Sequence, residues 1–458
     1  MKFIFADTMD YVDPGFDFAE DRNAADRQPY WDDEYPHEHM DAPPYDGMLV
    51  SRAAVGKGRL GGGKYTEAQA MALGRMGARA FLRLNGPRFQ HMPVFGDCGA
   101  FAYVKESVPP YTPEDMLTFY EDGQFTHGCS VDHIIFDFHE DDDEGRFSSV
   151  AARDEARRRF DITLANAEVF FRESRALGGR FTPLGVVQGW SPGSMARAAR
   201  SLCRMGYRYI AIGGTVPLRT PQVKSCVRAV RDAISPDIAL HVLGFAKAED
   251  IQQFVEFDIS SFDTTSPLRR AFKDSRCNYY LRRPGDGLDY YTALRVPQAT
   301  ENPKLQWLAK EGKVRQEDLQ RLESRALTAL RTFARGEADL DETLNAVLAY
   351  DSLTLLQSAK GEARTSRATL RANYRRTLAD RPWERCACRV CRELGVEVVI
   401  FRGSNRNKRR GIHNLAVFKS LVDDLPRLGE GACANEQVDL FSSPREPEPA
   451  ASSSVLRD

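Results

Sequence analysis

The sequence predicts an α/β protein whose largest part is a (β/α)₈ TIM barrel. Short runs rich in β-branched and aromatic residues recur over roughly the first 265 residues, and helical patterns separate them. Strands that alternate with helices favour a parallel sheet, and eight such units favour a closed barrel. The eight predicted strands are Phe3–Phe5, Gly47–Ser51, Pro93–Gly96, Gly128–Val131, Leu184–Val187, Tyr209–Ile212, Ala239–Leu243 and Ile259–Phe262.

The segments between these strands carry the apolar spacing of amphipathic helices. An acidic, Pro- and aromatic-rich stretch that includes Tyr30–Tyr35 follows the first strand. We expect it to be an extended surface or lid segment without regular structure. The predicted helices are Glu67–Leu82, Pro113–Asp122, Ala151–Leu177, Ser194–Met205, Gln222–Ile234 and Lys247–Phe254.

The composition divides the chain into five regions. Beyond the barrel, leucines recur at helical spacing and Gly336 is a plausible stop, which predicts a helical insertion. The last thirty or so residues are dominated by Gly, Pro, Ser and Glu and are expected to be disordered. The regions are 1–46 (N-terminal strand and acidic, aromatic segment), 47–270 (catalytic barrel), 271–380 (helical insertion), 381–426 (basic subdomain) and 427–458 (tail).

Three cysteines and a histidine near the C-terminus have the spacing of a metal site. Cys386, Cys388 and Cys391 form C-x-C-x-x-C, and His413 follows 22 residues after the last of them. Thiolates and imidazole are the ligands that Zn²⁺ prefers, and four of them leave no coordination position open for water. We therefore expect a structural rather than a catalytic zinc ion in region 381–426.

The surroundings of this cluster are strongly basic. Residues 360–410 hold fifteen Lys or Arg against five Asp or Glu, whereas the whole chain has a formal charge of −2. A concentrated basic face that carries Tyr374 and Trp383 suits a phosphate backbone. A solvated helix face usually interleaves both signs, so we expect nucleic acid to be the partner.

Composition excludes several classes of protein. A chain of 458 residues with 42% hydrophobic content can bury one large core and a smaller appendage. It contains no run of 18 apolar residues, and its first residues are too soon acidic for a signal peptide. Nine cysteines, three of them in the metal cluster, fit a reducing compartment better than a disulfide framework. We expect a cytoplasmic protein that neither spans nor binds a membrane.

Polar residues follow the predicted strands at the edge where barrel enzymes carry their active sites. They are Asp97, Asp132, Gln188, the Gly213–Gly214 turn and Asp263. Each has an ordinary explanation as a loop residue, but all of them come at the same edge. Paired carboxylates that flank a bond at C1′ of a sugar can break it, one as nucleophile and the other as acid and base.

These motifs resemble those of the tRNA-guanine transglycosylases. Gly96–Phe101 resembles their D-S-G-(G/S)-(F/Y) signature, Val186–Gly189 their V-Q-G, and Ala211–Gly214 their I-G-G. Ser261–Arg269 resembles the F-D-x-x-x-P-x-R segment that carries their nucleophile, and C-x-C-x-x-C…H matches their zinc set. The resemblance covers roughly residues 47–265 and 385–420 in the family's own order, and it implies a (β/α)₈ barrel that exchanges bases.

The resemblance implies two catalytic residues. Asp263 attacks C1′ of the target guanosine and forms a covalent glycosyl-enzyme while guanine leaves. Asp97 acts as general acid and base toward the departing and incoming bases. The exchange needs no redox cofactor and no ATP.

It also implies a set of base-binding residues. Asp132 and Gln188 hydrogen-bond the guanine-like edge, the backbone of Gly213 and Gly214 reads further polar atoms, and Phe101 stacks on the base. Within this reading a second carboxylate competes with Asp132, because Asp137 also ends an apolar stretch. We favour Asp132, which aligns with archaeal members without a gap, and regard Asp137 as the start of a solvated acidic loop.

Other features resemble the bacterial and phage DNA-guanine transglycosylases of the DpdA family. Asp263 and Cys386 are separated by 122 residues, more than in the tRNA enzymes, and Cys98 stands in the place of the signature serine. The resemblance implies insertion of a 7-deazaguanine base, 7-cyano-7-deazaguanine (preQ0), into DNA as part of a modification and restriction system with further proteins. A tRNA-guanine transglycosylase and a non-catalytic, zinc-containing nucleic-acid-binding protein are the alternatives.

The tail contains one apolar motif, Gln437–Phe441. Its pattern Q-x-x-L-F resembles the peptide with which bacterial DNA polymerases and repair proteins bind the sliding clamp. Such a tether would raise the local concentration of the enzyme on newly made duplex. The clamp is therefore a candidate partner, although five-residue motifs also arise by chance.

Overall fold

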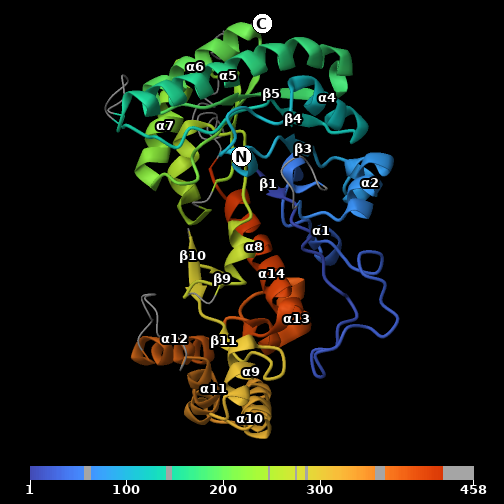
Figure 1. Cartoon of the computed structure of the whole chain (residues 1–458). Helices are drawn as coiled ribbons and strands as arrows, with labels where there is room; N and C mark the ends of the chain where they lie inside the picture. The colour runs from blue at the N-terminus through green and yellow to red at the C-terminus, as the bar shows by residue number, and fades with distance from the viewer. Residues whose placement is uncertain are drawn as a thin grey trace, which may run out of the picture.

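The computed structural model describes residues 1–55, 63–140, 147–245, 248–273, 276–283, 287–355 and 367–426. Its upper part in Figure 1 is a closed barrel of eight parallel strands in the order of the sequence. The strands are β1 (Lys2–Ala6), β2 (Gly47–Ser51), β3 (Val94–Asp97), β4 (His127–Cys129), β5 (Thr182–Val187), β6 (Tyr209–Ile212), β7 (Ala239–Val242) and β8 (Ser261–Asp263).

The predicted barrel is therefore confirmed, and each predicted strand overlaps an observed one. Closure depends on β1, which pairs with β2 on one side and with β8 on the other. In the second pairing Ile4 lies opposite Asp263. Because all eight strands run parallel, their carboxyl ends meet at one mouth, which is where barrel enzymes build their sites.

Helices cover the outside of the barrel in most of the predicted places. The predicted first helix is split in two at Gly77, whose φ of +80° a residue with a side chain rarely adopts. The last of them is a 3₁₀ helix, η4 (Ala248–Phe257), rather than an α-helix. The α-helices of this part are α2 (Glu67–Met76), α3 (Ala78–Phe81), α4 (Pro113–Asp122), α5 (Val150–Ser174), α6 (Pro192–Met205) and α7 (Thr220–Ala233).

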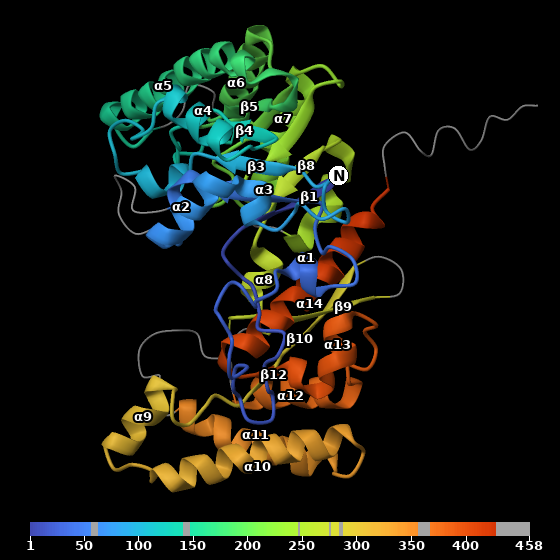
Figure 2. The same cartoon turned by 90° about the vertical axis from the view of Figure 1, so that its right-hand side faces the viewer.

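After the barrel the chain builds a second, lower part, seen from two sides in Figures 1 and 2. The predicted helical insertion is present, but an antiparallel hairpin of β9 and β10 precedes it, and β11 pairs with β12 from far along the chain. The elements are α8 (Ser266–Arg270), β9 (Tyr279–Arg282), β10 (Leu288–Tyr291), β11 (Leu294–Arg295), α9 (Pro303–Lys310), α10 (Gln316–Ala334), α11 (Leu340–Leu355), α12 (Arg367–Asp380), α13 (Arg389–Leu394), η5 (Gly395–Val399), β12 (Ile400–Phe401) and α14 (Gly403–Asp423).

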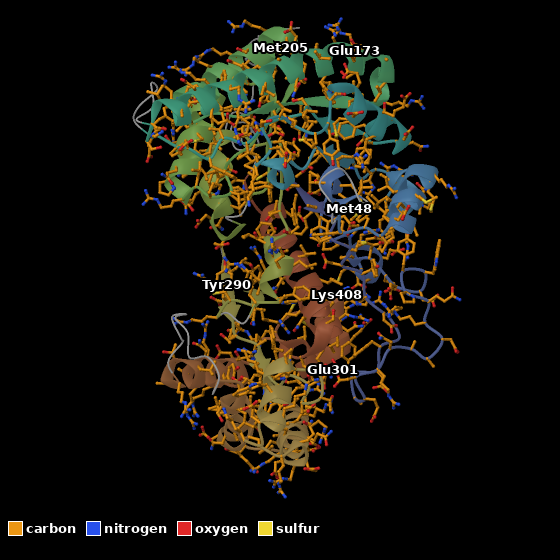
Figure 3. The ribbon with its side chains drawn as sticks, in the orientation of Figure 1. Met48, Glu173, Met205, Tyr290, Glu301 and Lys408 are labelled. Carbon is orange, nitrogen blue, oxygen red and sulfur yellow. The ribbon has the colours of Figure 1, made fainter. Side chains whose placement is uncertain are left out.

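Helix α14 joins the two parts. It packs against α8, β9 and β1, and Figure 3 labels Lys408 of α14 and Tyr290 of β10 between the barrel and the lower helices. The contact with α8 is close at Gly411, where an added Cβ would lie 2.9 Å from Leu268 Cγ. A side chain there would push the two helices apart.

Residues 7–46 are largely irregular, as expected, apart from the short helix α1 (Pro36–His39) and two isolated bridges. Much of this segment runs down beside the lower part, as Figure 2 shows. Asp21 of this segment forms ion pairs with Arg402 and Arg406. The N-terminal segment therefore ties the beginning of the chain to helix α14.

No helix in the described ranges combines the length and the apolar character needed to cross a membrane.

Candidate active site and metal centre

Two carboxylates end strands of the barrel wall, with β1 and β2 between those strands. Asp97 is the last residue of β3 and Asp263 the last of β8, and both therefore lie at the carboxyl mouth. They are close enough that the charges of Asp263 and Asp132 raise the pKa of Asp97. The structure brings together the three carboxylates that the sequence analysis placed at strand ends.

The carboxyl group of Asp97 has a raised pKa. Burial raises its pKa to about 7, and the charges of Asp263 and Asp132 add to burial against a hydrogen bond from Ser51. Its Oδ1 atom is buried and has no hydrogen-bond partner among the described residues. A carboxyl group that holds its proton about half of the time near neutral pH can both donate and accept one.

Asp263 is in a different environment. Its side chain is buried, and its Oδ1 atom accepts a hydrogen bond of 2.9 Å from the Gly244 backbone N–H. Nε2 of His241 lies 3.1 Å from the same oxygen. These two contacts on one oxygen orient the carboxyl group, and a carboxylate can act as a nucleophile.

Asp132 forms the centre of a buried polar cluster. Its Oδ2 atom accepts a 2.7 Å hydrogen bond from Gln188 Nε2, and its Oδ1 atom accepts one of 3.0 Å from the thiol of Cys98. Burial raises the pKa of Asp132, and these two donors oppose that rise. Asp137, in contrast, is exposed, so the geometry favours Asp132 over Asp137 as the carboxylate of the mouth.

The Gly213–Gly214 turn makes room for the Gln188 amide. A Cβ on Gly213 would collide with Gln188 Nε2, and one on Gly214 would lie 3.0 Å from Gln188 Oε1. Gly214 also has a φ of +72°, which side chains rarely adopt. Both glycines are therefore required by the amide that contacts Asp132.

Two aromatic rings stand at the rim of the mouth. Phe101 follows β3 and is 51% exposed, and Phe136 follows β4 and is 48% exposed. Their ring centroids are 6.0 Å apart. A cavity of about 380 Å³ is lined by Phe136 together with Lys105, Ile134 and Arg159. Exposed aromatic faces next to buried carboxylates can stack on a flat base.

Two residues of this site, Phe136 and His241, were missed from the sequence, as was the role of a third, Cys98. Phe136 belongs to an apolar run that the sequence analysis read only for its flanking carboxylates. His241 is a polar residue inside the apolar strand β7, and this was its only signal. Cys98 was noted as a replacement for serine, but its contact with Asp132 needs the fold.

The four predicted metal ligands come together. The ligand atoms of Cys386, Cys388, Cys391 and His413 lie within 4.8 Å of one another. His413 Nδ1 is 3.6, 3.3 and 3.3 Å from the three sulfur atoms in that order. A tetrahedral zinc ion with ordinary Zn–S and Zn–N bonds would require about 3.5 Å between sulfur and nitrogen. The donor set and its dimensions fit zinc.

The histidine of this cluster is held from behind. His413 Nε2 lies 2.7 Å from the carbonyl oxygen of Tyr280, to which it donates, and this leaves Nδ1 free as the ligand atom. The imidazole ring stacks on Tyr279 with centroids 4.1 Å apart. The cluster thus links the loop before α13, helix α14 and the hairpin strand β9.

The basic segment is less exposed than the sequence suggests. Arg402, Arg406, Arg409 and Arg410 are buried. Arg402 and Arg406 pair with acidic side chains, and Arg410 donates to backbone carbonyls and to an asparagine. These four arginines therefore stabilise the interior of the protein and are not exposed for contact with a phosphate backbone.

Tyr374 and Trp383, which we expected on the basic face, are also buried, at 1% and 3% exposure. Tyr374 instead donates a hydrogen bond to Asp351. The exposed arginines that remain are Arg367, Arg371, Arg375, Arg376, Arg385 and Arg392, while Lys360 and Arg364 lie outside the described residues.

Comparison with known proteins gives one informative relative. No protein-family model matches the chain. A DNA-guanine transglycosylase of Salmonella montevideo is 42% identical over 420 residues, which cover 91% of this chain and 95% of the relative. The match spans the barrel, the insertion and the metal cluster alike, so the chain belongs to the DNA-guanine transglycosylase family and is a pentosyltransferase.

Proposed function

We propose that this protein exchanges guanine in DNA for a 7-deazaguanine base, preQ0, through a covalent aspartyl-glycosyl intermediate. The observation that carries the proposal is the contrast between Asp97 and Asp263 at one barrel mouth. Asp97, with a pKa raised to about 7, is poised to exchange a proton near neutral pH, whereas Asp263 is oriented by contacts of its Oδ1 atom with the Gly244 N–H and with His241. Two carboxyl groups with such different environments can divide the roles of acid–base catalyst and nucleophile.

In the first half-reaction, Asp263 attacks C1′ of the target deoxyguanosine. The C1′–N9 bond breaks and its electron pair leaves with guanine, which takes the proton of Asp97. The product is an ester between Asp263 and C1′. Free guanine can then leave the mouth.

In the second half-reaction, Asp97 takes the N9 proton of the incoming 7-deazaguanine. N9 attacks C1′, and the bond from C1′ to Asp263 breaks, which regenerates the carboxylate. The sugar keeps its configuration after two displacements. The pKa of Asp97, at about 7, suits both directions of proton transfer.

Base recognition is assigned to the buried cluster and the rim. Guanine and 7-deazaguanines share the same N–H donors on their pairing edge, and a carboxylate is an acceptor only. Asp132, held by Gln188 and Cys98, would accept from that edge, while Gly213 and Gly214 keep the Gln188 amide in place. Phe101 is assigned to stacking on the base, and we add Phe136 as a second aromatic wall.

DNA is proposed as the substrate because the relative carries that name and because its match covers the whole described architecture. A base inside a duplex cannot reach buried carboxylates, so the target nucleotide must be flipped out or presented single-stranded. The zinc ion, when bound, would cross-link hairpin, α13 and α14 without entering the chemistry. Exposed arginines of α12 are assigned to the phosphate backbone.

We further propose that the protein acts within a DNA modification and restriction system, together with other proteins that supply preQ0 and use the modified DNA. A sliding clamp is a further candidate partner through Gln437–Phe441, which lies outside the described residues.

Mass spectrometry of nucleosides tests the proposal. DNA and tRNA are digested separately from cells that express the protein, the Asp263→Ala variant or neither, with preQ0 available. A 7-deazaguanine deoxynucleoside should appear in DNA only with the unchanged protein. A modified nucleoside in tRNA alone would identify a tRNA enzyme. Absence from both pools, with folded protein and preQ0 present, would favour a non-catalytic binder.

A further inference from the structure

A chain of hydrogen-bonding side chains lies inside the barrel beneath Asp263. His241 of β7 and Ser261 of β8 are both completely buried, and Tyr209 of β6 reaches the same point. His241 and Ser261 are opposite each other in the pairing of β7 with β8. Asp263 comes two residues after Ser261 and therefore projects from the same face of its strand. The side chains of these three strands therefore form one continuous polar path toward the mouth of the barrel.

The distances along this path are those of hydrogen bonds. Tyr209 Oη lies 2.5 Å from Ser261 Oγ, Ser261 Oγ lies 2.6 Å from His241 Nδ1, and His241 Nε2 lies 3.1 Å from Asp263 Oδ1. The imidazole also stacks on Phe95 with ring centroids 5.3 Å apart. Two hydrogen bonds and one stacked face leave the ring a single orientation.

When His241 is neutral, only one assignment of donors and acceptors fits the hydrogen bonds along this path. A neutral imidazole has one N–H and one acceptor nitrogen, and the carboxylate of Asp263 can only accept. Nε2 must then carry the proton and donate to Asp263, so Nδ1 accepts from the Ser261 hydroxyl. The Ser261 oxygen in turn accepts from Tyr209. The Ser261 hydroxyl therefore donates to His241 and accepts from Tyr209, which is consistent with the tautomer of His241 that donates to Asp263.

We propose that His241 is a positioning residue for the nucleophile, and that it holds Oδ1 of Asp263 so that Oδ2 is the oxygen that attacks C1′. The Gly244 N–H and His241 both contact Oδ1, whereas no hydrogen bond to Oδ2 occurs among the described residues. With one oxygen engaged by two donors, the carboxylate plane is held and the other oxygen keeps its lone pairs. This inference rests on the proposed glycosyl transfer.

The same contact favours the second half-reaction. In the ester intermediate Oδ1 is a carbonyl oxygen, and it becomes a full carboxylate oxygen again when the C1′–O bond breaks. Hydrogen bonds to a charged oxygen are stronger than those to a neutral one. The His241 N–H therefore stabilises the departing carboxylate more than the ester, and its loss is expected in kcat rather than in KM.

The groups that face His241 and Asp263 from neighbouring strands define the electrostatics. Asp97 and Asp132 lie at the same mouth as Asp263. His127 of β4 stacks on Phe95 with ring centroids 4.3 Å apart, and Phe95 also stacks on His241. Burial, followed by the charge of His241 and that of Lys2, lowers the pKa of His127 to about 4. His127 therefore adds no fixed charge beside Phe95 at neutral pH.

Three purified variants test the proposal by the kcat and KM for exchange of labelled guanine into DNA. His241→Phe keeps a ring on Phe95 but removes both hydrogen bonds. His241→Gln retains an N–H donor at a position similar to Nε2. His127→Phe is the matched control, because it changes a half-buried histidine that stacks on the same aromatic ring and has no hydrogen bond to Asp97 or Asp263. Thermal melting of each variant reports on folding.

We expect His241→Phe to lower kcat by roughly ten- to a hundredfold with little change in KM, as for loss of one hydrogen bond to a charged group. His241→Gln should recover most of kcat, because it restores a donor to Oδ1 of Asp263. His127→Phe should leave both kcat and KM unchanged.

Other results overturn the proposal. An unchanged kcat in folded His241→Phe would assign His241 to packing alone. If His241→Phe does not fold, a folded His241→Gln with low kcat would show that donation from this position does not hold the nucleophile. Failure of the unchanged protein to exchange guanine in DNA would instead refute the proposed function and not the placement of His241.

Discussion

Replacement of Asp97 by asparagine is expected to lower the rate of base exchange and to raise the stability of the folded protein at pH 8. The buried carboxyl has a pKa of about 7 in the folded protein, against a reference value of 3.8. Between these values the folded state binds more protons than the unfolded state, so stability falls as pH rises through this range. Asp97→Asn removes the titrating group but keeps the size of the side chain.

The size of the effect follows from the pKa difference. A difference of about three pKa units corresponds to about 4 kcal/mol, which is an upper bound on the penalty fully present above pH 7 and absent below pH 4. Asp97→Asn should therefore melt at a higher temperature than the unchanged protein at pH 8, and the two should converge near pH 4. Its exchange rate should fall by roughly 10² to 10⁴, because an amide neither gives nor takes the proton.

Thermal unfolding from pH 4 to 9, together with guanine exchange, measures both effects. Asp137→Asn is the control, since this carboxylate is exposed near the same mouth and should change neither quantity. If the melting temperatures of Asp97→Asn and the unchanged protein differ by a constant amount at every pH, the raised pKa is refuted. Retention of full exchange activity by Asp97→Asn would refute its catalytic role.

Four further outcomes are expected. Asp263→Ala should give no covalent protein–DNA adduct on a denaturing gel, whereas the unchanged protein should give one; an adduct with the variant would move the nucleophile elsewhere. Cys388→Ser should lower both the zinc content and the melting temperature, since metal-binding energy in such sites is folding energy, and a zinc-free variant of unchanged stability would contradict this. Phe136→Ala should weaken DNA binding by roughly ten- to a hundredfold while Phe136→Trp retains it, as for the loss of one base stack. Replacement of Arg375 and Arg376 by glutamine should reduce the slope of log binding constant against log salt by roughly two units; an equal slope would place the phosphate contacts elsewhere.

Local patterns in the sequence determined the barrel and the ends of its strands. β-Rich runs that alternate with helical ones specify a parallel sheet, and parallel strands bring their carboxyl ends to one mouth. Asp97 and Asp263 could therefore be assigned to that mouth without coordinates. Cys386, Cys388 and Cys391 could also be assigned as metal ligands from the sequence alone. They lie close together in the chain, and their spacing is itself the signal of a metal site.

Only the tertiary structure decided which charged and polar side chains are free to act. Arg406 has the sequence context of a phosphate contact, yet it is buried against Asp21, which lies 385 residues earlier. His241 has the context of an ordinary strand residue, yet it contacts Asp263 from a neighbouring strand. Burial and hydrogen bonding depend on which distant segments meet, and these set both the pKa of a group and its accessibility. A local sequence pattern carries little of that information. The period of the apolar residues shows which face of a helix or strand is buried, but it does not show which distant segment packs against that face.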